Sequence, residues 1–395
     1  MNFETILPKA QSPYAPIRLR DTFWWKFGQR IADEKRIFAE GYRHAGLEDY
    51  IGEKLILPMM QYVQRARFKD QNDQEFTGAV VDQGRALALV LAQEMNYWVP
   101  MAALYELNGR QIFDLGDELS EMLAHTDFGD TTLDKWQAPY TAFYVRFGLH
   151  EHIKLRNEAG ELEYVDGAFI AKVPRSVDPD TEYTIQIALT TVSTDARADA
   201  IPGYFFDISP AEQQMPVREG LDQALARNIN DLVVARDHAE HPEMEGLFTQ
   251  YIALMEDCRI YMQSAAELIV NALFYLESVG SRRPPTSGRD TPPELEAQWM
   301  QATPEKKRKL RSRLTREGYA VVYLMGQELV GGRRPGGSGS KSAHWRRGHW
   351  RWQPHGAGRE QVKRIWIKPV MIHSDLSPTD PPGHLYVTGA PPTPH

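Results

Sequence analysis

Cysteine is almost absent from this chain of 395 residues, which contains only Cys258. A single cysteine cannot form an internal disulfide, so the sequence excludes a disulfide-stabilised fold and indicates a reducing, cytoplasmic setting. Long apolar runs are absent too. The longest charge-free stretch, near Leu268–Leu276, is far shorter than the roughly 20 residues that span a bilayer. Glu4 lies where a signal peptide needs a basic and then apolar start, so we expect no signal peptide and no membrane partner.

The familiar catalytic and cofactor motifs are also missing. No GxSxG, HExxH, CxxC or EF-hand pattern occurs in the sequence. Gly336–Ser342 is similar to a phosphate-binding loop, but Ser340 stands where a glycine must precede the lysine, which favours a flexible hinge. His150 and His152 would share one side of a strand, yet no acidic or cysteine partner lies at a fixed spacing from them. We therefore expect no metal and no cofactor, and we favour a non-enzymatic protein.

Acidic residues are scarce near the C-terminus. Residues 305–368 hold 17 Lys or Arg and 4 Asp or Glu, a local net charge of +13. Because the whole chain carries −8, the remaining residues carry −21. A basic module attached to an acidic body indicates a polyanionic partner, with nucleic acid as the first candidate. The alternative is a basic segment that docks on the acidic body of its own chain.

Hydrophobic periodicity divides the rest of the chain into helices and strands. Helical spacing begins with an apolar stripe from Trp24 to Phe38 and predicts further helices at 58–66, 84–98 and 115–124. Pro100 should kink or end the helix before it. Alternation then predicts strands at 141–147, 152–156, 164–173, 183–192 and 204–208. Asp166-Gly167 resembles a turn that would split the third strand. Helices return at 216–239 and 246–279, and Cys258 lies on the apolar stripe of the second, where it should serve packing.

These elements predict an α+β protein. A helical N-terminal layer, a central antiparallel sheet and a long amphipathic helix form its body, and a basic C-terminal β-hairpin module follows. The predicted divisions are an extended arm at 1–18, the α+β body at 19–279, a Pro-rich linker at 280–304, the basic module at 305–375 and a disordered tail at 376–395.

The most distinctive stretch, Ser342–His373, interleaves arginine with tryptophan. It predicts a β-hairpin with strands at 344–353 and 361–372, a turn at 354–358 and Pro369 at an edge or bulge. Gly348 would allow a close approach or a bulge. If alternation holds, Ile365 and Ile367 face a core, and Arg364, Trp366 and Lys368 face the other way.

This composition is typical of RNA recognition. Guanidinium groups bind phosphate bidentately, and aromatic rings stack on unpaired bases for about 1–3 kcal/mol per base. The predicted RNA-contacting residues are Arg346, Arg347, His349, Trp350, Arg351, Arg364, Trp366 and Lys368. An equally weighted alternative is a structural hairpin in which the Trp–Arg stacking is internal and the indoles build a small core.

His344 and His349 suggest another alternative function, a metal-independent ribonuclease. Two histidines beside arginines can act as acid, base and charge clamp in metal-independent RNA cleavage. Their odd spacing puts them on opposite faces of a regular strand, so this ribonuclease would need a bulge at Gly348.

The hairpin residues also resemble a known family. His344-Trp-Arg-Arg-Gly-His-Trp350, followed by Arg364-Ile-Trp-Ile-Lys-Pro369, is similar to the C-terminal signature of a phage- and plasmid-borne anti-CRISPR family. That family is typified by the second described type V-A anti-CRISPR protein, which suppresses production of the Cas twelve-a nuclease. Two weaker features agree, the strand that begins at Pro139-Tyr-Thr-Ala-Phe-Tyr144 and the apolar helix Ala266–Ser278.

The resemblance implies inhibition at the level of synthesis. It implies recognition of the nascent N-terminal polypeptide of a target, with the type V-A nuclease as one candidate, followed by loss of the mRNA. Its implied partners are that polypeptide and RNA or the ribosome, in the cytoplasm of a bacterial host. It supplies no catalytic residues and no peptide-binding residues. Peptide capture by edge-strand addition would suit the central sheet, and Phe143, Tyr144 and Val145 either border such a site or form plain sheet core. A phage or plasmid protein–protein module without RNA contact is the last alternative.

Overall fold

The structure is a computed structural model. It describes residues 14–20, 25–26, 28–30, 32–33, 98–134, 136–151, 153–156, 161–174, 183–192, 204–238, 242–279, 285–288, 291–326 and 344–372. The expected helix at 58–66, the stripe residues Trp24 and Phe38, the Gly336–Ser342 hinge and the C-terminal tail lie outside these residues. None of the helices it describes is long and apolar enough to cross a membrane.

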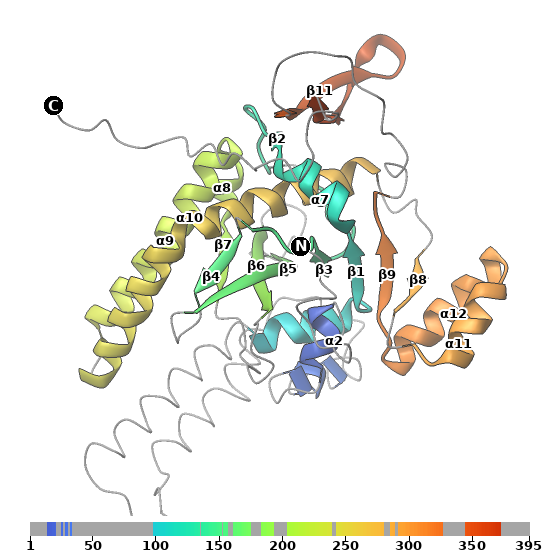
Figure 1. Cartoon of the computed structure of the whole chain (residues 1–395), viewed down its shortest axis with the longest axis horizontal. Coiled ribbons are helices and arrows are strands. Elements are labelled where there is room, and N and C mark those ends of the chain that lie inside the picture. The colour runs from blue at the N-terminus through green and yellow to red at the C-terminus, as the bar shows by residue number, and fades with distance from the viewer. Residues whose placement is uncertain are drawn as a thin grey trace, which may run out of the picture.

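The centre of the fold is a mixed sheet of eight strands (Figure 1). Its order is β7-β6-β5-β3-β1-β9-β8, and β4 pairs with β5 outside this path. The strands are β1 Gln111–Asp114, β3 Ala142–Arg146, β4 Lys154–Arg156, β5 Leu162–Pro174, β6 Tyr183–Val192, β7 Phe205–Ile208, β8 Thr286–Ser287 and β9 Val321–Leu324. The α+β class is confirmed, and the strands from β3 to β7 pair antiparallel as expected.

The sheet is not wholly antiparallel. β1 pairs in parallel with β3 on one side and with β9 on the other. Parallel neighbours need a crossover, and helix α7 (Gly116–Ala124) lies in the connection from β1 to β3. β1 was not predicted, because four residues are too few for alternation to stand out.

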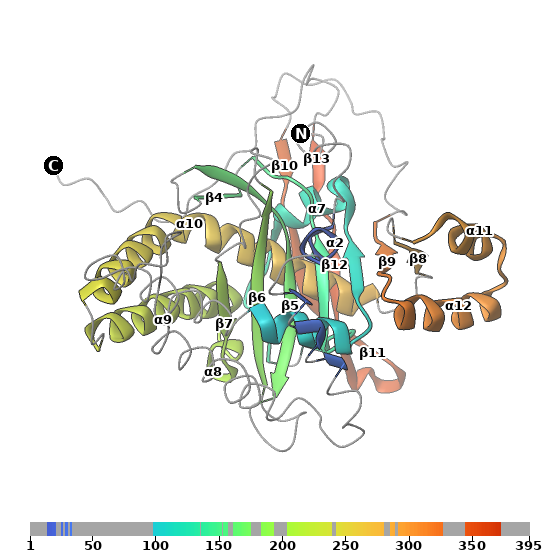
Figure 2. The ribbon, with the colours of Figure 1, turned by 90° about the horizontal axis from the view of Figure 1, so that it is seen from below.

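Helices cover both faces of the sheet (Figures 1 and 2). One face packs on α7, α9 (Val217–Asp237) and α10 (Pro242–Val279), and short α8 (Pro210–Gln213) precedes α9. The other face packs on N-terminal helical residues, namely α2 (Ala15–Leu19), parts of 25–33 and residues 98–107. The sequence predicts that Pro100 kinks or ends the helix, but the described helical residues 98–107 continue past it, so the helix does not end there; most of the expected helix 84–98 lies outside the described residues. Alternating residues of β3 explain the two layers, since Phe143 and Val145 join the first cluster and Ala142 and Tyr144 the second.

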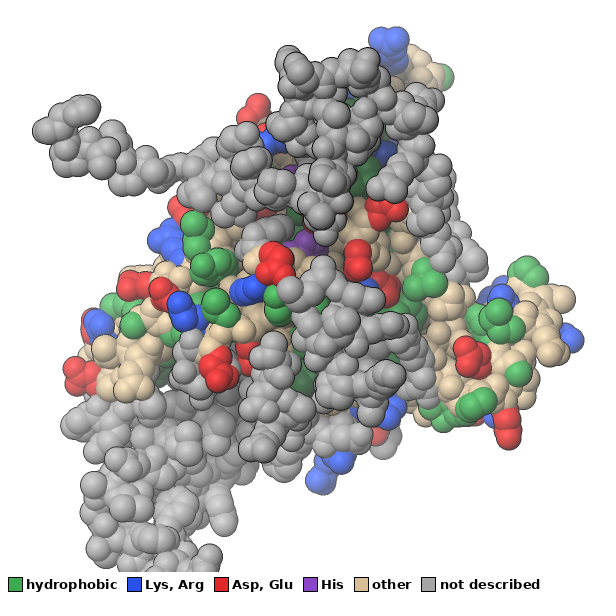
Figure 3. Space-filling view, in the orientation of Figure 1, with side chains coloured by type: hydrophobic (Ala, Val, Ile, Leu, Met, Phe, Trp, Pro, Cys, Tyr) green, Lys and Arg blue, Asp and Glu red, His purple; other side chains and the backbone are tan. Residues whose placement is uncertain are grey.

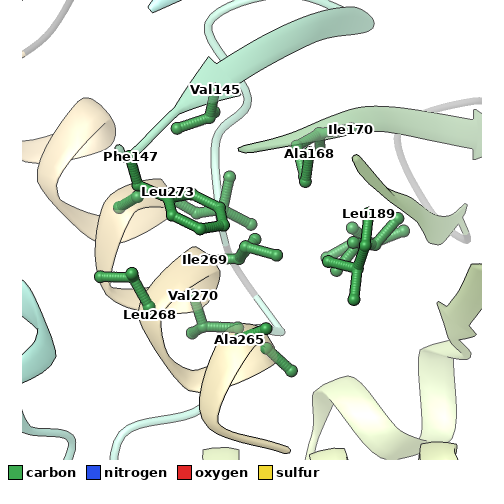
Figure 4. Close-up of a cluster of buried hydrophobic side chains, with 14 of the residues drawn as sticks. Val145, Phe147, Ala168, Ile170, Leu189, Ala265, Leu268, Ile269, Val270 and Leu273 are labelled. Carbon is green, nitrogen blue, oxygen red and sulfur yellow. The ribbon is translucent and has the colours of Figure 1, made fainter. Parts of the chain in front are cut away.

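Helix α10 forms the spine of the larger core. Figure 4 shows Ile269, Leu273 and their neighbours on α10 turned toward Val145, Ile170 and Leu189 of the sheet. Cys258 is buried on this helix, and its sulfur accepts a hydrogen bond from the Arg156 backbone N–H and lies 3.5 Å from the Tyr204 hydroxyl oxygen. The predicted packing role of Cys258 is therefore confirmed.

The stretch expected to be a Pro-rich linker contains ordered elements. β8 lies within 280–304 and pairs antiparallel with β9, and α11 (Pro293–Gln301) begins directly after Pro292. A second helix, α12 (Pro304–Glu317), follows. Proline suits the first turn of a helix, whose N–H groups have no partner within the helix, so the prolines here start helices instead of preventing them.

The Asp166-Gly167 pair is a bulge within a continuous strand, not a turn. β5 runs through it, and its register with β6 shifts between Val165 and Gly167. The buried Asp166 carboxylate accepts hydrogen bonds from Arg18, 2.8 Å away, and from the Thr190 hydroxyl. Gly167 is needed because a Cβ there would overlap the Tyr144 hydroxyl and the Val145 carbonyl.

Replacing Gly167 with alanine should destabilise the fold. The added methyl group has no room between the two strands, and overpacking of this kind costs about 1–3 kcal/mol. Urea unfolding of Gly167→Ala measures the loss. Gly246→Ala in α10 is the matched control, because nothing lies within 4 Å of its Cβ position. The control should gain up to about 1 kcal/mol from helix propensity. Equal stability of Gly167→Ala and the wild type would contradict the packing argument.

Candidate nucleic-acid interface

The predicted β-hairpin is present near the top of Figure 1. β11 (Gly348–His355) pairs antiparallel with β12 (Gln361–Ile367), and Trp350 lies opposite Trp366. A short 3-10 turn, Ala357–Arg359, joins them. The outer parts of the expected strands separate as β10 (His344–Arg346) and β13 (Val370–Ile372), which pair with each other. β11 also pairs with β2 (Thr126–Asp127) of the body.

The predicted close approach at Gly348 is confirmed. A Cβ on this residue would lie 2.6 Å from Cδ of Pro369 and 2.7 Å from the Ile367 carbonyl oxygen. The Gly348 N–H donates to the carbonyl of His125, at the end of α7. Only a residue without a side chain lets this strand approach Ile367 and Pro369 so closely.

Two tryptophans of the hairpin, Trp350 and Trp366, anchor it to the body. Trp350 is 4% exposed, and its indole N–H donates to Oδ1 of Asn271 on α10 at 2.8 Å. Its ring stacks on Trp366 and meets Phe274 edge to face. The Trp366 indole N–H donates to the Thr126 hydroxyl at 3.0 Å. Both indole N–H groups therefore find acceptors in the body, as buried indoles usually do.

Arg364 is buried between the hairpin and α10. Its guanidinium lies 3.7 Å from the Phe274 ring centroid and 4.7 Å from that of Trp352. It forms an ion pair with Glu277 and donates to the Thr132 carbonyl at 3.1 Å. Burial lowers the pKa of Arg364 and raises the pKa of Glu277, although the arginine charge opposes the rise. The pair thus bears a desolvation cost that its attraction offsets only in part.

The predicted faces of β12 are reversed. Arg364 and Trp366 turn toward α10, whereas Ile365 and Ile367 are half-buried on the other side. The reason is chemical complementarity, because α10 presents the Asn271 amide and the Glu277 carboxylate among its apolar residues. Polar hydrogen-bond partners therefore select the basic and aromatic face over the aliphatic one.

Burial divides the predicted RNA-contacting residues into two groups. Trp350 and Arg364 lie in the core and Trp366 packs against it, so Trp350 and Arg364 have almost no surface to offer a ligand. Trp350, Trp366 and Arg364 thus make the internal aromatic and Trp–Arg contacts that the structural-hairpin alternative predicted. The exposed members are Arg347, His349, Arg351 and Lys368. Arg346 belongs to β10, and the position of its side chain lies outside the described residues.

The outer face of the hairpin is the candidate interface. The cross-strand pairs His349–Ile367, Arg351–Ile365 and Gln353–Lys363 lie on it. Lys363, Arg359 at the turn and Lys368 are also exposed. Residues 344–372 contain seven Lys or Arg and one acidic residue, Glu360. We call the exposed Arg351, Lys363 and Lys368 the hairpin cations.

His344 and His349 lie on different strands, β10 and β11, which pair with different partners. His349 is exposed, and the side chain of His344 lies outside the described residues. Nothing therefore places the two rings together. Among the residues that the structure describes, no three His, Cys, Asp or Glu side chains are grouped to hold a metal ion.

A histidine and glutamate cluster lies beside the hairpin's attachment. Glu121 on α7 contacts His125 Nε2 at 3.0 Å and His150 Nδ1 at 3.4 Å, and the Ser120 hydroxyl lies 2.7 Å from His150 Nε2. Hydrogen bonds from His125 and then His150 hold the pKa of Glu121 far below its ordinary value. The cluster joins the end of α7 to the loop after β3. Glu121 could not be identified from the sequence as a partner of His150, because their contact depends on the tertiary fold.

The residues of α10 that hold the hairpin were also not identified from the sequence. Asn271 and Glu277 interrupt an apolar stripe within Ala266–Ser278, the segment that carried a weaker part of the family resemblance. Polar residues on a buried face were the available signal. Phe143, Tyr144 and Val145 are buried in β3, an interior strand, so plain sheet core is the correct interpretation for them.

Comparison with known protein families identifies the class of protein. The model of the AcrVA2-like family, the anti-CRISPR type V subtype A2 family, matches residues 113–374, most of the chain. The chain therefore belongs to this anti-CRISPR family. A crystal structure of AcrVA2 is among its structural neighbours, with 12% identity, a TM-score of 0.42 and coverage of 90% of this chain and 97% of that one. No match is found among curated proteins.

Neutralising Glu277 should weaken the attachment of the hairpin. Glu277→Gln leaves the Arg364 guanidinium buried without its carboxylate, and breaking such a pair typically costs about 3–5 kcal/mol. The retained amide oxygen and the 21% exposure of Glu277 should reduce the loss to about 2–3 kcal/mol. Urea unfolding measures it. Arg351→Gln, an exposed change on the same hairpin, should stay within about 0.5 kcal/mol of the wild type. A similar small effect of both changes would argue against a structural pair.

The Glu121 cluster should make stability depend on pH. The pKa of Glu121 is lowered on folding, so its contribution is present above the ordinary value of 4.5 and is lost as the pH falls below it. Glu121→Gln removes this contribution. The melting temperature of the variant should lie below that of the wild type near about pH 6, and the difference should shrink progressively as the pH falls from about 4.5 to about 2, toward the lowered pKa of the folded state. A constant difference across this range would show that the carboxylate charge is not responsible.

Proposed function

We propose that this chain recognises the nascent N-terminal polypeptide of its target and lowers expression of that target through loss of the mRNA. The basic C-terminal module contacts RNA or the ribosome during this process. The type V-A nuclease is the first candidate target. Membership of the anti-CRISPR family supports a protein target connected with CRISPR, and the hairpin supports the RNA contact.

The observation that carries the RNA contact is the two-sided hairpin. On its inner face Trp350, Trp366 and Arg364 bond to the body, whereas Arg351 and Lys363 on its outer face and Lys368 directly after β12 are exposed. A ribbon held on one side and basic on the other is a suitable contact for phosphate groups, because its cations need no reorganisation before they bind.

A second observation favours a protein contact at the same module. Val362 is 60% exposed, Val370 57% and Trp352 45%, all on or beside the hairpin. Apolar side chains of this size on a surface are typical of protein–protein contacts. A protein–protein module without RNA contact is therefore the alternative function, and the ribosome would satisfy both kinds of surface.

A reporter assay separates recognition of the polypeptide from recognition of the RNA. The N-terminal codons of the type V-A nuclease are fused to a reporter in three forms: natural, synonymously recoded, and shifted in reading frame with nearly the same bases. With the full chain co-expressed, reporter mRNA should fall in the first two forms and persist in the third. Loss of the mRNA from the natural and frame-shifted forms, but not from the recoded form, would show that the nucleotide sequence is recognised and would refute the proposal.

The hairpin cations can be tested in the same assay. Arg351→Gln, Lys363→Gln and Lys368→Gln combined should reduce mRNA loss several-fold, because three phosphate contacts are removed without disturbing the inner face. The matched control removes three cations from the body, Arg218, Arg236 and Arg259, each of which pairs with a carboxylate. Unchanged mRNA loss in the hairpin variant would favour the protein–protein alternative.

A further inference from the structure

Helix α12, which lies outside the hairpin, carries the densest positive charge among the described residues. Seven of its fourteen residues are Lys or Arg, and its two acidic residues lie at its ends. Lys306, Lys309 and Arg316 are exposed, and among the residues that the structure describes they form no ion pair. Arg313, also exposed, pairs with Glu317.

These four cations lie on one side of the helix. Their spacing of three and four residues places them within about 80° of one another around the axis, along about 15 Å of its length. The apolar residues Leu310 and Leu314 fall on another side, where they pack with Leu295 and Trp299 of α11. The helix is therefore amphipathic, with a buried apolar side and a basic stripe, which we define as Lys306, Lys309, Arg313 and Arg316.

The stripe is held in a fixed orientation. Arg311 donates to the Tyr140 hydroxyl at 2.8 Å and to Gln111 Oε1 at 3.2 Å, and its guanidinium lies near the Tyr323 ring. Arg110 donates to the Thr315 carbonyl at the end of the helix. These bonds to β1, β9 and the loop before β3 prevent α12 from rotating. Within α12, Arg311 therefore attaches the helix to the body, and the stripe residues remain exposed to solvent.

The surroundings of the stripe differ from those of cations elsewhere. Figures 1 and 2 show α11 and α12 projecting beyond the β8 and β9 edge of the sheet. Along α9 and α10 the charges of both signs alternate in Figure 3, and Arg218, Arg236 and Arg259 there have carboxylate partners. Arg313 of the stripe is paired with Glu317, but Lys306, Lys309 and Arg316 have no such partner among the described residues, so these three retain their full attraction for an external polyanion.

We infer that the basic stripe of α12 binds the phosphate backbone of RNA, as a second contact separate from the hairpin. The stripe holds only lysine and arginine, so it offers charged donors for phosphate and no aromatic surface for base stacking. Binding there is sequence-independent. This inference rests on the proposed function in one respect, since the proposed loss of an mRNA is the reason to choose RNA over DNA.

Two other partners fit the stripe less well. An anionic membrane requires the apolar side of an amphipathic helix for insertion, and that side of α12 is covered by α11. In a DNA major groove a recognition helix presents its N-terminal residues to base edges. Here Thr303 and Pro304 occupy the N-terminus of α12, and the cations lie along its flank.

Binding of RNA across a series of salt concentrations tests the inference. The probe is a fluorescent single-stranded RNA of about 20 nucleotides, and a DNA duplex of the same sequence is the competitor. Three full-length variants are compared with the wild type. They are the stripe variant (Lys306→Gln, Lys309→Gln, Arg316→Gln), the hairpin-cation variant, and the body control at Arg218, Arg236 and Arg259. Gln has nearly the helix propensity of Lys and Arg, so circular dichroism should show unchanged folding of the stripe variant.

The stripe variant should bind RNA more weakly than the wild type. The slope of log K against log salt should become shallower by about 2, because each lost phosphate contact on a single strand contributes about 0.7. The body control should keep the wild-type slope. Equal slopes for the stripe variant and the wild type, or an equal change in the body control, would overturn the inference. Preferential binding of the DNA duplex would overturn the choice of RNA.

The reporter assay distinguishes this inference from the proposed function. If the stripe binds RNA but reporter mRNA never falls, the proposed function fails and the α12 contact stands. If mRNA falls in the wild type and the stripe variant keeps the full RNA affinity, the proposed function stands and the inference fails.

Discussion

Two polar side chains on an otherwise apolar helix determine how the C-terminal part of this protein is attached. Asn271 donates to the carbonyls of Leu123 and Thr126 and accepts from the Trp350 indole, so one amide joins α10, the end of α7, β2 and the hairpin. Glu277, less than two turns further along, receives Arg364. A buried amide with these bonds satisfied and a buried ion pair tolerate few other arrangements of the same surfaces. They specify the position of the hairpin more strongly than apolar contact alone would.

This attachment gives the family signature a physical meaning. The motif around His344–Trp350 and Arg364–Pro369 carried the resemblance, and so did the helix Ala266–Ser278. In the structure these segments pack on each other, through Trp350 with Asn271, Arg364 with Phe274 and Trp366 with Tyr275. The resemblance therefore marks one interface within the fold. Trp350, Trp366 and Arg364 hold that interface together, whereas Arg347 and Lys368 of the same signature are exposed.

Much of the body could be predicted from the sequence, since its elements are long and their patterns agree with their environment. β6 occupies the expected residues 183–192, and α9 and α10 lie within a few residues of their expected bounds. β1 and β8 were missed because strands of four and two residues carry no periodicity, and β8 follows prolines that indicated a linker. The parallel pairing of β1 with β3 and β9 depends on contacts more than 30 residues apart in sequence, which local patterns do not record.

The candidate site shows a different limit of sequence reasoning. Within β12, alternation identified correctly which residues share a face, but which face is buried depends on the partner surface. Hydrophobicity alone favoured Ile365 and Ile367 as the inner pair. The hydrogen-bonding groups of α10 reversed that choice, because an indole or a guanidinium that finds an acceptor can be buried with its full aromatic or cationic contact. In a basic, tryptophan-rich ribbon, the residues that look most suited to a ligand are thus also the ones best suited to a polar interface within the protein. Accessible charge, as on the hairpin cations and on α12, is the more useful guide to an external partner, since only a solvent-facing cation can exchange its counterions for phosphate.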